Sequence, residues 1–289
     1  PAFWIMLGGV ALNVLMNWIL IWGRLGAPEL GLEGAGVATL IARAGTLAAL
    51  IAWSRRSPHI REWVPRHWFR PPCRDSLRSL IKVGLPASLQ LLAEVSAFVF
   101  ATILIGTMGK EALASHQVAI SCAATVFMVP LGLSMALTVR VGEAWGAGAR
   151  DRLRPIVVSG WLMAVVFTIF SAGSVLAFHG NIAGWFLTDP GARSVAAALL
   201  IVSAAFQFSD ALQILSAGAL RGLDDVTVPA WIAVFAYWVV SLPLGWWLAF
   251  PHGQGLGVTG MWWGITVGLT ITAATLGGRL WRKTTPAPA

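Results

Sequence analysis

Residues 80–105 read LIKVGLPASLQLLAEVSAFVFATILI, and this stretch decides the fold. An α-helix needs about 20 mostly apolar residues to cross a bilayer, and this run exceeds that length. Its centre is mostly apolar and contains a single charged residue, Glu94. A run of this length and composition predicts a transmembrane helix rather than a helix in the core of a water-soluble domain.

The whole chain has the same character. It contains 289 residues, of which 57% are hydrophobic and 11% charged, and its mean hydropathy is +0.75. Soluble domains carry about 25% charged residues, so this composition excludes a water-soluble globule. We predict an all-α, polytopic transmembrane bundle with eight spans, at residues 2–22, 33–53, 80–105, 117–137, 156–178, 195–217, 228–250 and 257–277.

The net charge of +8 does not indicate a nucleic-acid partner, because the basic residues follow a membrane topology. Sixteen of the 20 Lys and Arg residues lie in alternate connections and in the tail, at 55–82, 140–154, 221 and 279–283. The opposite connections hold only three. Cytoplasmic loops carry the excess of Lys and Arg, so we predict a multi-pass protein of the inner (plasma) membrane with both ends of this chain in the cytoplasm.

The chain shows weak internal symmetry. Residues 31–34 (GLEG) fall opposite residues 257–260 (GVTG), each at the short connection within a pair of spans. The two pairs are offset by six spans, an even number, so they run in the same direction. This layout predicts parallel six-span repeats, a known transporter design. Residues 1–53 would hold the last two spans of the first lobe, 54–79 a basic connector and 80–289 the second lobe, so we expect four more spans before residue 1. The connector either lies on the membrane surface or is a solvated link.

Cysteine and histidine suggest neither a disulfide nor a site for a transition metal. Cys73 lies in the basic connector and Cys122 in a span. The five His residues are scattered, and we expect each in a loop or at the end of a span.

Only two acids lie well inside spans, Glu94 and Asp210. A charge at the bilayer centre costs about 2.5–3.5 kcal/mol on insertion scales, so a buried acid there usually faces an interior cavity and serves function. The alternative is a structural hydrogen bond or an ion pair with Arg43, the cation within the second span.

Polar residues accompany both acids at helical spacing. They form three stripes: Pro86, Gln90 and Glu94; Gln207, Asp210 and Gln213; and Gln117 with Ser121 and Thr125. We expect the stripes to converge on a shared interior, with Pro86 kinking its helix. Carboxylate and amide oxygens suit Na⁺, and a carboxylate also carries H⁺, so the sequence predicts Na⁺ or H⁺ as the coupling ion and no other cofactor. Gly260, Gly264 and Gly268 predict a ridge for close helix packing.

Six short motifs follow one another along the chain: GLP at 84–86 before Glu94, LASHQVA at 113–119, PLGLS at 130–134, TVRVG at 138–142, DALQ at 210–213 and AGALRG at 217–222. In this order and spacing they resemble the multidrug and toxic compound extrusion (MATE) family of antiporters, nearest its bacterial Na⁺-coupled branch. The resemblance implies two six-span lobes and places Glu94 and Asp210 in the cation site of the second lobe.

The combined interpretation is a secondary antiporter, not an enzyme, that exports cationic amphiphilic drugs or toxins in exchange for Na⁺ or H⁺ by alternating access. One alternative is a flippase for lipid-linked saccharides, which would need a cavity rich in Arg and Lys where only Arg43 is available. Another is a membrane-embedded enzyme, which would need His residues among the buried acids.

Overall fold

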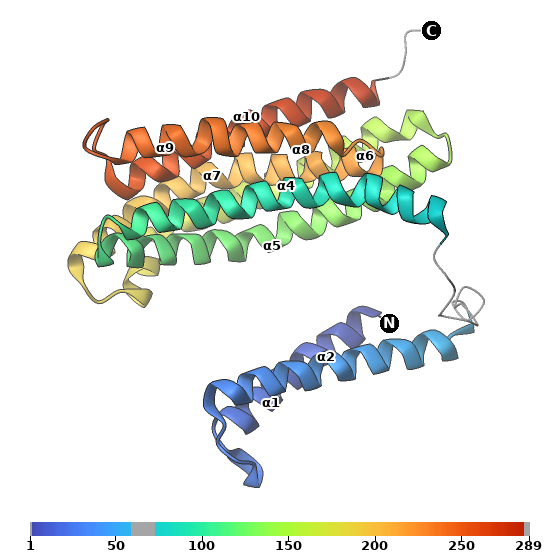
Figure 1. The fold of residues 1–289 in the computed structure, drawn as a ribbon, viewed down its shortest axis with the longest axis horizontal. Helices are drawn as coiled ribbons and strands as arrows, with labels where there is room; N and C mark the ends of the chain where they lie inside the picture. Colours follow the sequence, from blue (N-terminus) through green and yellow to red (C-terminus); the bar gives the residue numbers. More distant parts are fainter. Residues whose placement is uncertain (1, 59–72, 286–289) are drawn as a thin grey trace. The chain divides into compact units, whose positions relative to one another are not determined.

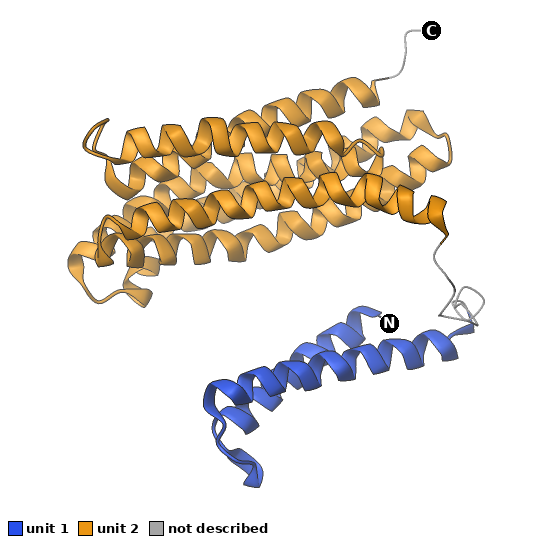
Figure 2. Ribbon diagram, viewed as in Figure 1, with its two compact units in different colours: residues 1–72 blue, residues 73–289 orange. Residues whose placement is uncertain are grey.

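The computed structural model describes residues 2–58 and 73–285. The chain divides into two compact units, residues 1–72 (unit 1) and 73–289 (unit 2) (Figure 2). Within the described ranges every regular element is a helix, which confirms the predicted all-α fold (Figure 1). Most of the predicted basic connector, at residues 59–72, lies outside the described residues.

Unit 1 is a helical hairpin. Helix α1 (Ala2–Ile21) and helix α2 (Gly31–Arg56) pack along each other and are joined by a short 3₁₀ turn, η1 (Arg24–Gly26). A Cβ atom on Gly34 would lie 2.6 Å from the carbonyl oxygen of Leu20, so glycine is what allows the two backbones to approach this closely.

Unit 2 is a bundle arranged around one buried helix. Its elements are α4 (Arg74–Gly106), α5 (Lys110–Gly146), α6 (Arg150–Phe186), α7 (Pro190–Gly222), α8 (Thr227–Val234), the π-helical segment η2 (Phe235–Ser241), α9 (Leu242–Ala249) and α10 (Gly257–Thr284). Helix α7 packs against α5, α6 and α10, and α4 packs mainly on α8 and η2. The centre of the bundle is therefore the helix that carries Asp210.

The helices extend beyond the predicted spans. Helices α5 and α6 contain 37 residues each, about 55 Å at 1.5 Å per residue, against a hydrocarbon core of about 30 Å. Seven helical stretches in the described residues are long and apolar enough to cross a membrane. The eighth predicted span lies in α10, which has 28 residues but contains Gly, Thr and Trp residues that lower its mean hydropathy.

The predicted glycine ridge on α10 is confirmed. Gly260, Gly264 and Gly268 are all buried, and a Cβ atom on each would collide with α9 or with η2. The added Cβ on Gly260 would lie 2.6 Å from the carbonyl oxygen of Leu248, for example. The three glycines therefore let α10 pack in backbone contact with the broken helix beside it.

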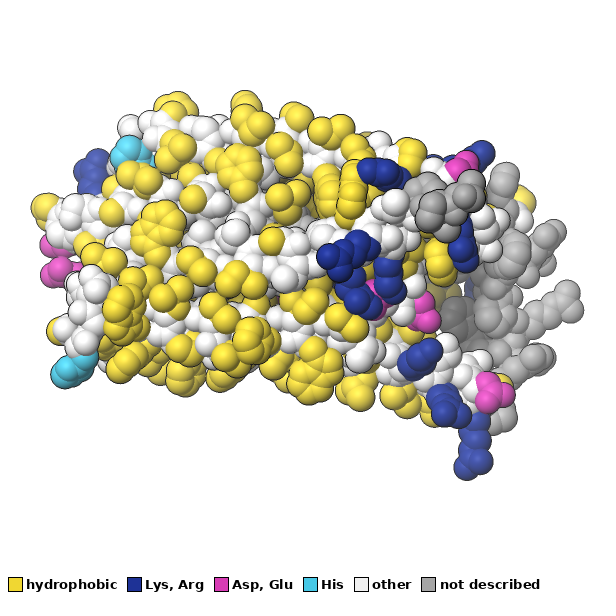
Figure 3. All heavy atoms as spheres, turned by 90° about the horizontal axis from the view of Figure 1, so that it is seen from above, with side chains coloured by type: hydrophobic (Ala, Val, Ile, Leu, Met, Phe, Trp, Pro, Cys, Tyr) yellow, Lys and Arg dark blue, Asp and Glu magenta, His cyan; other side chains and the backbone are white. Residues whose placement is uncertain are grey.

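Charge separates along the helices. On the face drawn in Figure 3, Lys and Arg side chains gather at one end and apolar side chains cover the length between the ends. In unit 2 this basic end collects the start of α4 and α6 and the end of α5, α7 and α10, because successive helices alternate in direction. A polar end beside an apolar middle is the pattern of a multi-pass membrane protein.

Candidate functional site

Glu94 and Asp210 come together inside unit 2. Glu94 lies on α4 and is half-buried, and Asp210 lies on α7 with 7% of its surface exposed. Phe98, one turn after Glu94, and Phe206, one turn before Asp210, pack edge to face, so both acids belong to the same part of the bundle interior. Neither acid forms an ion pair with another residue in the part of the chain that the structure describes. Two uncompensated carboxyl groups in an apolar bundle are the feature that needs a functional explanation.

Gln213 and Tyr237 complete the group around Glu94. The Glu94 carboxyl approaches the Gln213 amide and the Tyr237 hydroxyl, but neither contact has the geometry of a full hydrogen bond. Gln213 is fully buried and Tyr237 is 1% exposed, and their polar atoms have no hydrogen-bond partner among the described residues. Buried polar atoms without partners are costly, so this group is suited to binding a cation or water.

Tyr237 was not predicted from the sequence. It lies in η2, where the helix widens from α to π geometry just before Pro243. Proline lacks an N–H and its ring crowds the carbonyl four residues earlier, and a π turn relieves both constraints. Two features of the sequence could have pointed to it: Tyr237 is the only tyrosine in the sequence, and it lies in the same predicted span as Pro243.

The two remaining glutamines on α4 and α7 have different surroundings. Gln90 is buried on α4 one turn before Glu94, as the stripe predicts. Gln207 is also buried, but its Oε1 accepts a hydrogen bond from Ser171 of α6 at 2.7 Å. Pro86 lies within α4, which continues as an α-helix on both sides of it. The α4 stripe therefore leads to the acids, whereas Gln207 connects α7 to α6.

The stripe on α5 does not join this group. Gln117 is exposed on unit 2, as are Ser121 and Thr125, whereas the preceding residue, His116, is fully buried. His116 lies in the second turn of α5, at the end of the predicted span, but its side chain faces the core. Neighbouring residues on a helix point about 100° apart, so polarity alone could not tell which of the two faces the core.

His116 joins three helices on one side of the acids. Its Nδ1 accepts a hydrogen bond from Trp262 Nε1 of α10 at 3.1 Å, so the proton of the neutral ring lies on Nε2. Nε2 then donates to Thr102 Oγ1 of α4 at 2.9 Å, and Thr102 Oγ1 donates to the carbonyl oxygen of Phe98 at 2.8 Å. This chain of hydrogen bonds fixes α4 against α5 and α10 two turns from Glu94.

An aromatic layer lies between this network and the acids. Phe98 is one turn after Glu94, and Phe206 is one turn before Asp210. The two phenyl rings pack edge to face with centroids 6.1 Å apart, and the ring centroids of Phe98 and Tyr237 are 6.5 Å apart. The layer separates the acids from the end of the bundle opposite the basic one.

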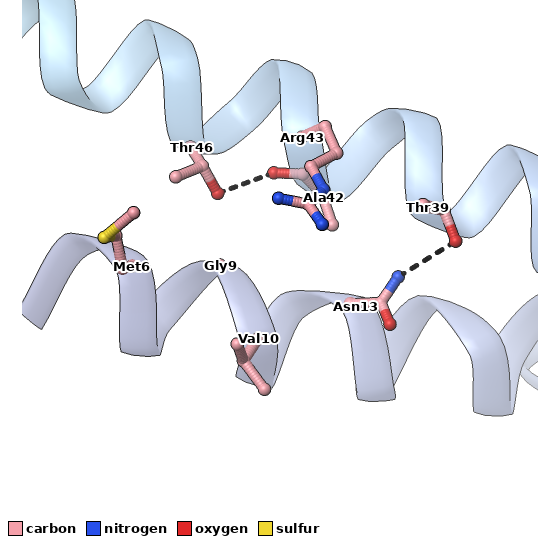
Figure 4. Close-up of a pocket in the computed structure, with 8 residues that line it drawn as sticks. All are labelled: Met6, Gly9, Val10, Asn13, Thr39, Ala42, Arg43 and Thr46. Carbon is pink, nitrogen blue, oxygen red and sulfur yellow. Dashed lines mark hydrogen bonds between the residues drawn. The ribbon is translucent and has the colours of Figure 1, made fainter. Parts of the chain in front are cut away.

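Arg43 belongs to a different pocket, within unit 1. The hollow between α1 and α2 has a volume of about 250 Å³ and is lined by Met6, Gly9, Val10, Asn13, Thr39, Ala42, Arg43 and Thr46 (Figure 4). Asn13 Nδ2 donates to Thr39 Oγ1 across the two helices at 3.4 Å. Arg43 is exposed on unit 1, so its pairing with an acid stays a prediction.

Comparison with known proteins identifies the architecture. The model of the MatE family matches residues 86–247, more than half of the chain, and this region contains both acids and Tyr237. The chain belongs to the MatE family. This assignment confirms the predicted resemblance, the helical membrane fold and the prediction that the chain is not an enzyme.

Individual MatE relatives match nearly the whole chain. It is 34% identical over 279 residues to a probable multidrug resistance protein NorM of Pasteurella multocida, with 96% of this chain and 60% of the relative covered. It is 37% identical over 285 residues to the multidrug resistance protein PmpM of Pseudomonas aeruginosa, covering 98% of this chain and 60% of the relative. The chain thus spans about 60% of the length of these relatives.

Solved MatE structures have the same fold. The eukaryotic MATE transporter AtDTX14 matches with a TM-score of 0.86 at 20% identity, over 97% of this chain and 62% of the other. An outward-facing multidrug resistance MATE transporter of the MOP superfamily matches with a TM-score of 0.82 at 21% identity, over 96% and 62%. At this identity the likeness establishes the fold alone.

Proposed function

We propose that this chain provides the second lobe, and with it the cation site, of a secondary antiporter that exports cationic amphiphilic drugs in exchange for Na⁺ or H⁺. The observation that carries the proposal is the pair of carboxyl groups of Glu94 and Asp210. They belong to the same part of the bundle interior, beside the unpartnered Gln213 and Tyr237. The relatives named as multidrug resistance proteins support the substrate class.

A bound cation would offset the unfavourable free energy of placing two carboxyl groups inside the bundle. Two like charges that repel each other destabilise the empty site, and one Na⁺ or one proton removes much of that repulsion. Binding free energy at such a site can then bias the equilibrium between two conformations of the transporter, which is the requirement for coupling. The proposal also includes the division of the chain into lobes. Residues 1–53 would form the end of the first lobe and residues 80–289 the second lobe.

The orientation is also proposed. The basic end of unit 2 would face the cytoplasm, which would place the start and end of this chain on the cytoplasmic side of the inner membrane. The flippase alternative gains little support, because the pocket in unit 1 contains one basic residue, Arg43, where a pyrophosphate would need several.

The test is drug efflux driven by an imposed Na⁺ or H⁺ gradient, with variants made in the complete reading frame that contains these 289 residues. Glu94→Gln and Asp210→Asn keep the size of the side chain and remove its charge. Losing a charged ligand costs roughly 1.5–3 kcal/mol, so the apparent affinity for the coupling ion should fall about tenfold or more.

The matched control is Glu143→Gln, which makes the same change at an exposed acid whose partner, Arg140, is also exposed. The control should transport normally. Efflux is normalised to the amount of folded protein in the membrane. Normal gradient-driven efflux in both site variants would refute the cation site, and a drop in protein amount in place of a drop in ion affinity would support the structural alternative.

A further inference from the structure

Two arginines at the basic end of unit 2 lie on tryptophan rings instead of pairing with acids. The guanidinium carbon of Arg154 lies 3.8 Å from the ring centroid of Trp281, and that of Arg150 lies 5.2 Å from the ring centroid of Trp145. Both arginines are in the first two turns of α6 and are four residues apart, so they share one helix face. Each tryptophan comes from a different neighbouring helix, α10 for Trp281 and α5 for Trp145.

Three other cations at this end have acidic partners. Arg140 pairs with Glu143, and both Arg279 and Lys283 pair with Asp225. In the described part of the chain, Arg150 and Arg154 make no ion pair. A guanidinium that rests flat on a ring keeps the N–H groups along its edge free to donate to an anion, and phosphate oxygens match that geometry.

Two stacked tryptophan rings, those of Trp281 and Trp161, lie beneath the Arg154 guanidinium. The ring of Trp161 stacks on that of Trp281 with centroids 6.3 Å apart and planes within 11°, and it lies against Gly277. Trp161 Nε1 is buried and has no hydrogen-bond partner among the described residues. The N-terminus of α6 adds the positive end of a 37-residue helix dipole to the same region.

An apolar surface continues from this site along α6. Val158, Leu162 and Val166 follow Arg154 at four-residue spacing along one row of the helix. Val158 is partly exposed, and Leu162 and Val166 are 60% and 66% exposed. An anion held at Arg154 could therefore carry hydrocarbon chains down the lipid-facing side of the helix. This continuity favours a lipid over a small soluble anion.

We propose that Arg150, which lies on Trp145, and Arg154, which lies on Trp281, bind the phosphate headgroup of an acidic phospholipid at the membrane surface. The acyl chains would follow the exposed apolar face of α6. Asp151 lies in the same turn but pairs with neither arginine, so the local charge remains positive. The site is independent of the cation site and of the direction of transport.

The experiment measures binding of phosphatidylglycerol to the purified protein in detergent by native mass spectrometry. Phosphatidylcholine with identical chains and inorganic phosphate serve as competitors. Arg154→Gln should lower the apparent affinity for phosphatidylglycerol about fivefold. The control, Arg140→Gln, removes the same charge at the same end without a ring contact and should change the affinity less than twofold.

The remaining outcomes separate the site from general attraction to basic charge. Arg154→Lys keeps the charge but loses the planar fork, so it should bind more weakly than the unmodified protein. It also decides the matter if Arg154→Gln fails to fold. Equal losses in Arg154→Gln and Arg140→Gln, displacement by phosphatidylcholine, or displacement by inorganic phosphate would each overturn the proposal.

Discussion

Gly260→Ala tests how closely α10 packs on the neighbouring helix. The added Cβ would lie 2.6 Å from both the carbonyl carbon and the carbonyl oxygen of Leu248, and 2.8 Å from the nitrogen of Ala249. All three atoms belong to the backbone, so no side-chain rotation can relieve the collision. The N–H of Leu256 also donates to the oxygen of Leu248 at 2.9 Å, which fixes the start of α10 at this position.

The size of the effect follows from that geometry. Ordinary contact for a Cβ atom begins at 3.4 Å, so the two backbones would have to separate by about 0.8 Å from the 2.6 Å approach. Overpacking of this kind typically costs about 1–3 kcal/mol. Alanine in place of glycine inside a helix returns only about 0.5–1 kcal/mol, so the net change should be destabilising.

The assay is thermal unfolding of the purified protein, with Gly278→Ala as the control. Gly278 lies in the same helix, is exposed, and has no atom within 4 Å of its added Cβ. Gly260→Ala should lower the Tm by roughly 2–8 °C, whereas Gly278→Ala should leave it unchanged or raise it slightly. A Gly260→Ala variant as stable as the control would show that α9 and α10 are not in backbone contact.

Two further predictions concern the basic end of unit 2. Burial alone would raise the pKa of Asp225, but hydrogen bonds from Arg279 and Lys283 outweigh it and hold the pKa below its usual 3.8. Folding therefore favours the charged carboxylate, and Asp225→Asn should destabilise the protein by on the order of 1 kcal/mol at pH 7. Thermal melts of the two proteins should show this difference in stability become smaller as the pH falls below about 4, because the carboxylate is then protonated. For the orientation, a membrane-impermeant maleimide should label Cys73, which is exposed at the start of α4, only after cells are opened. With the natural cysteines replaced by serine, Lys110→Cys should react in intact cells, and the opposite labelling pattern would reverse the proposed topology.

The sequence alone determined the membrane fold. Spans were predictable because the bilayer imposes one strong rule, that about 20 apolar residues must satisfy their own backbone hydrogen bonds in a helix. Glu94 and Asp210 could be selected by the same rule, since a charge within such a run is conspicuous. The ridge of Gly260, Gly264 and Gly268 was predictable because its four-residue spacing is local.

Only the tertiary structure decided which side chains meet. The polarity of Gln117 was visible in the sequence, but the rotation of α5 turns His116 inward and leaves Gln117 on the exposed face of unit 2. Tyr237 lies near Glu94 and belongs to η2, a π-helical segment whose facing a periodicity of 3.6 residues does not describe. Burial and contact at these positions depend on how neighbouring helices pack. Packing depends in turn on side chains that lie far apart in the sequence, and the hydropathy of a single segment carries no information about them.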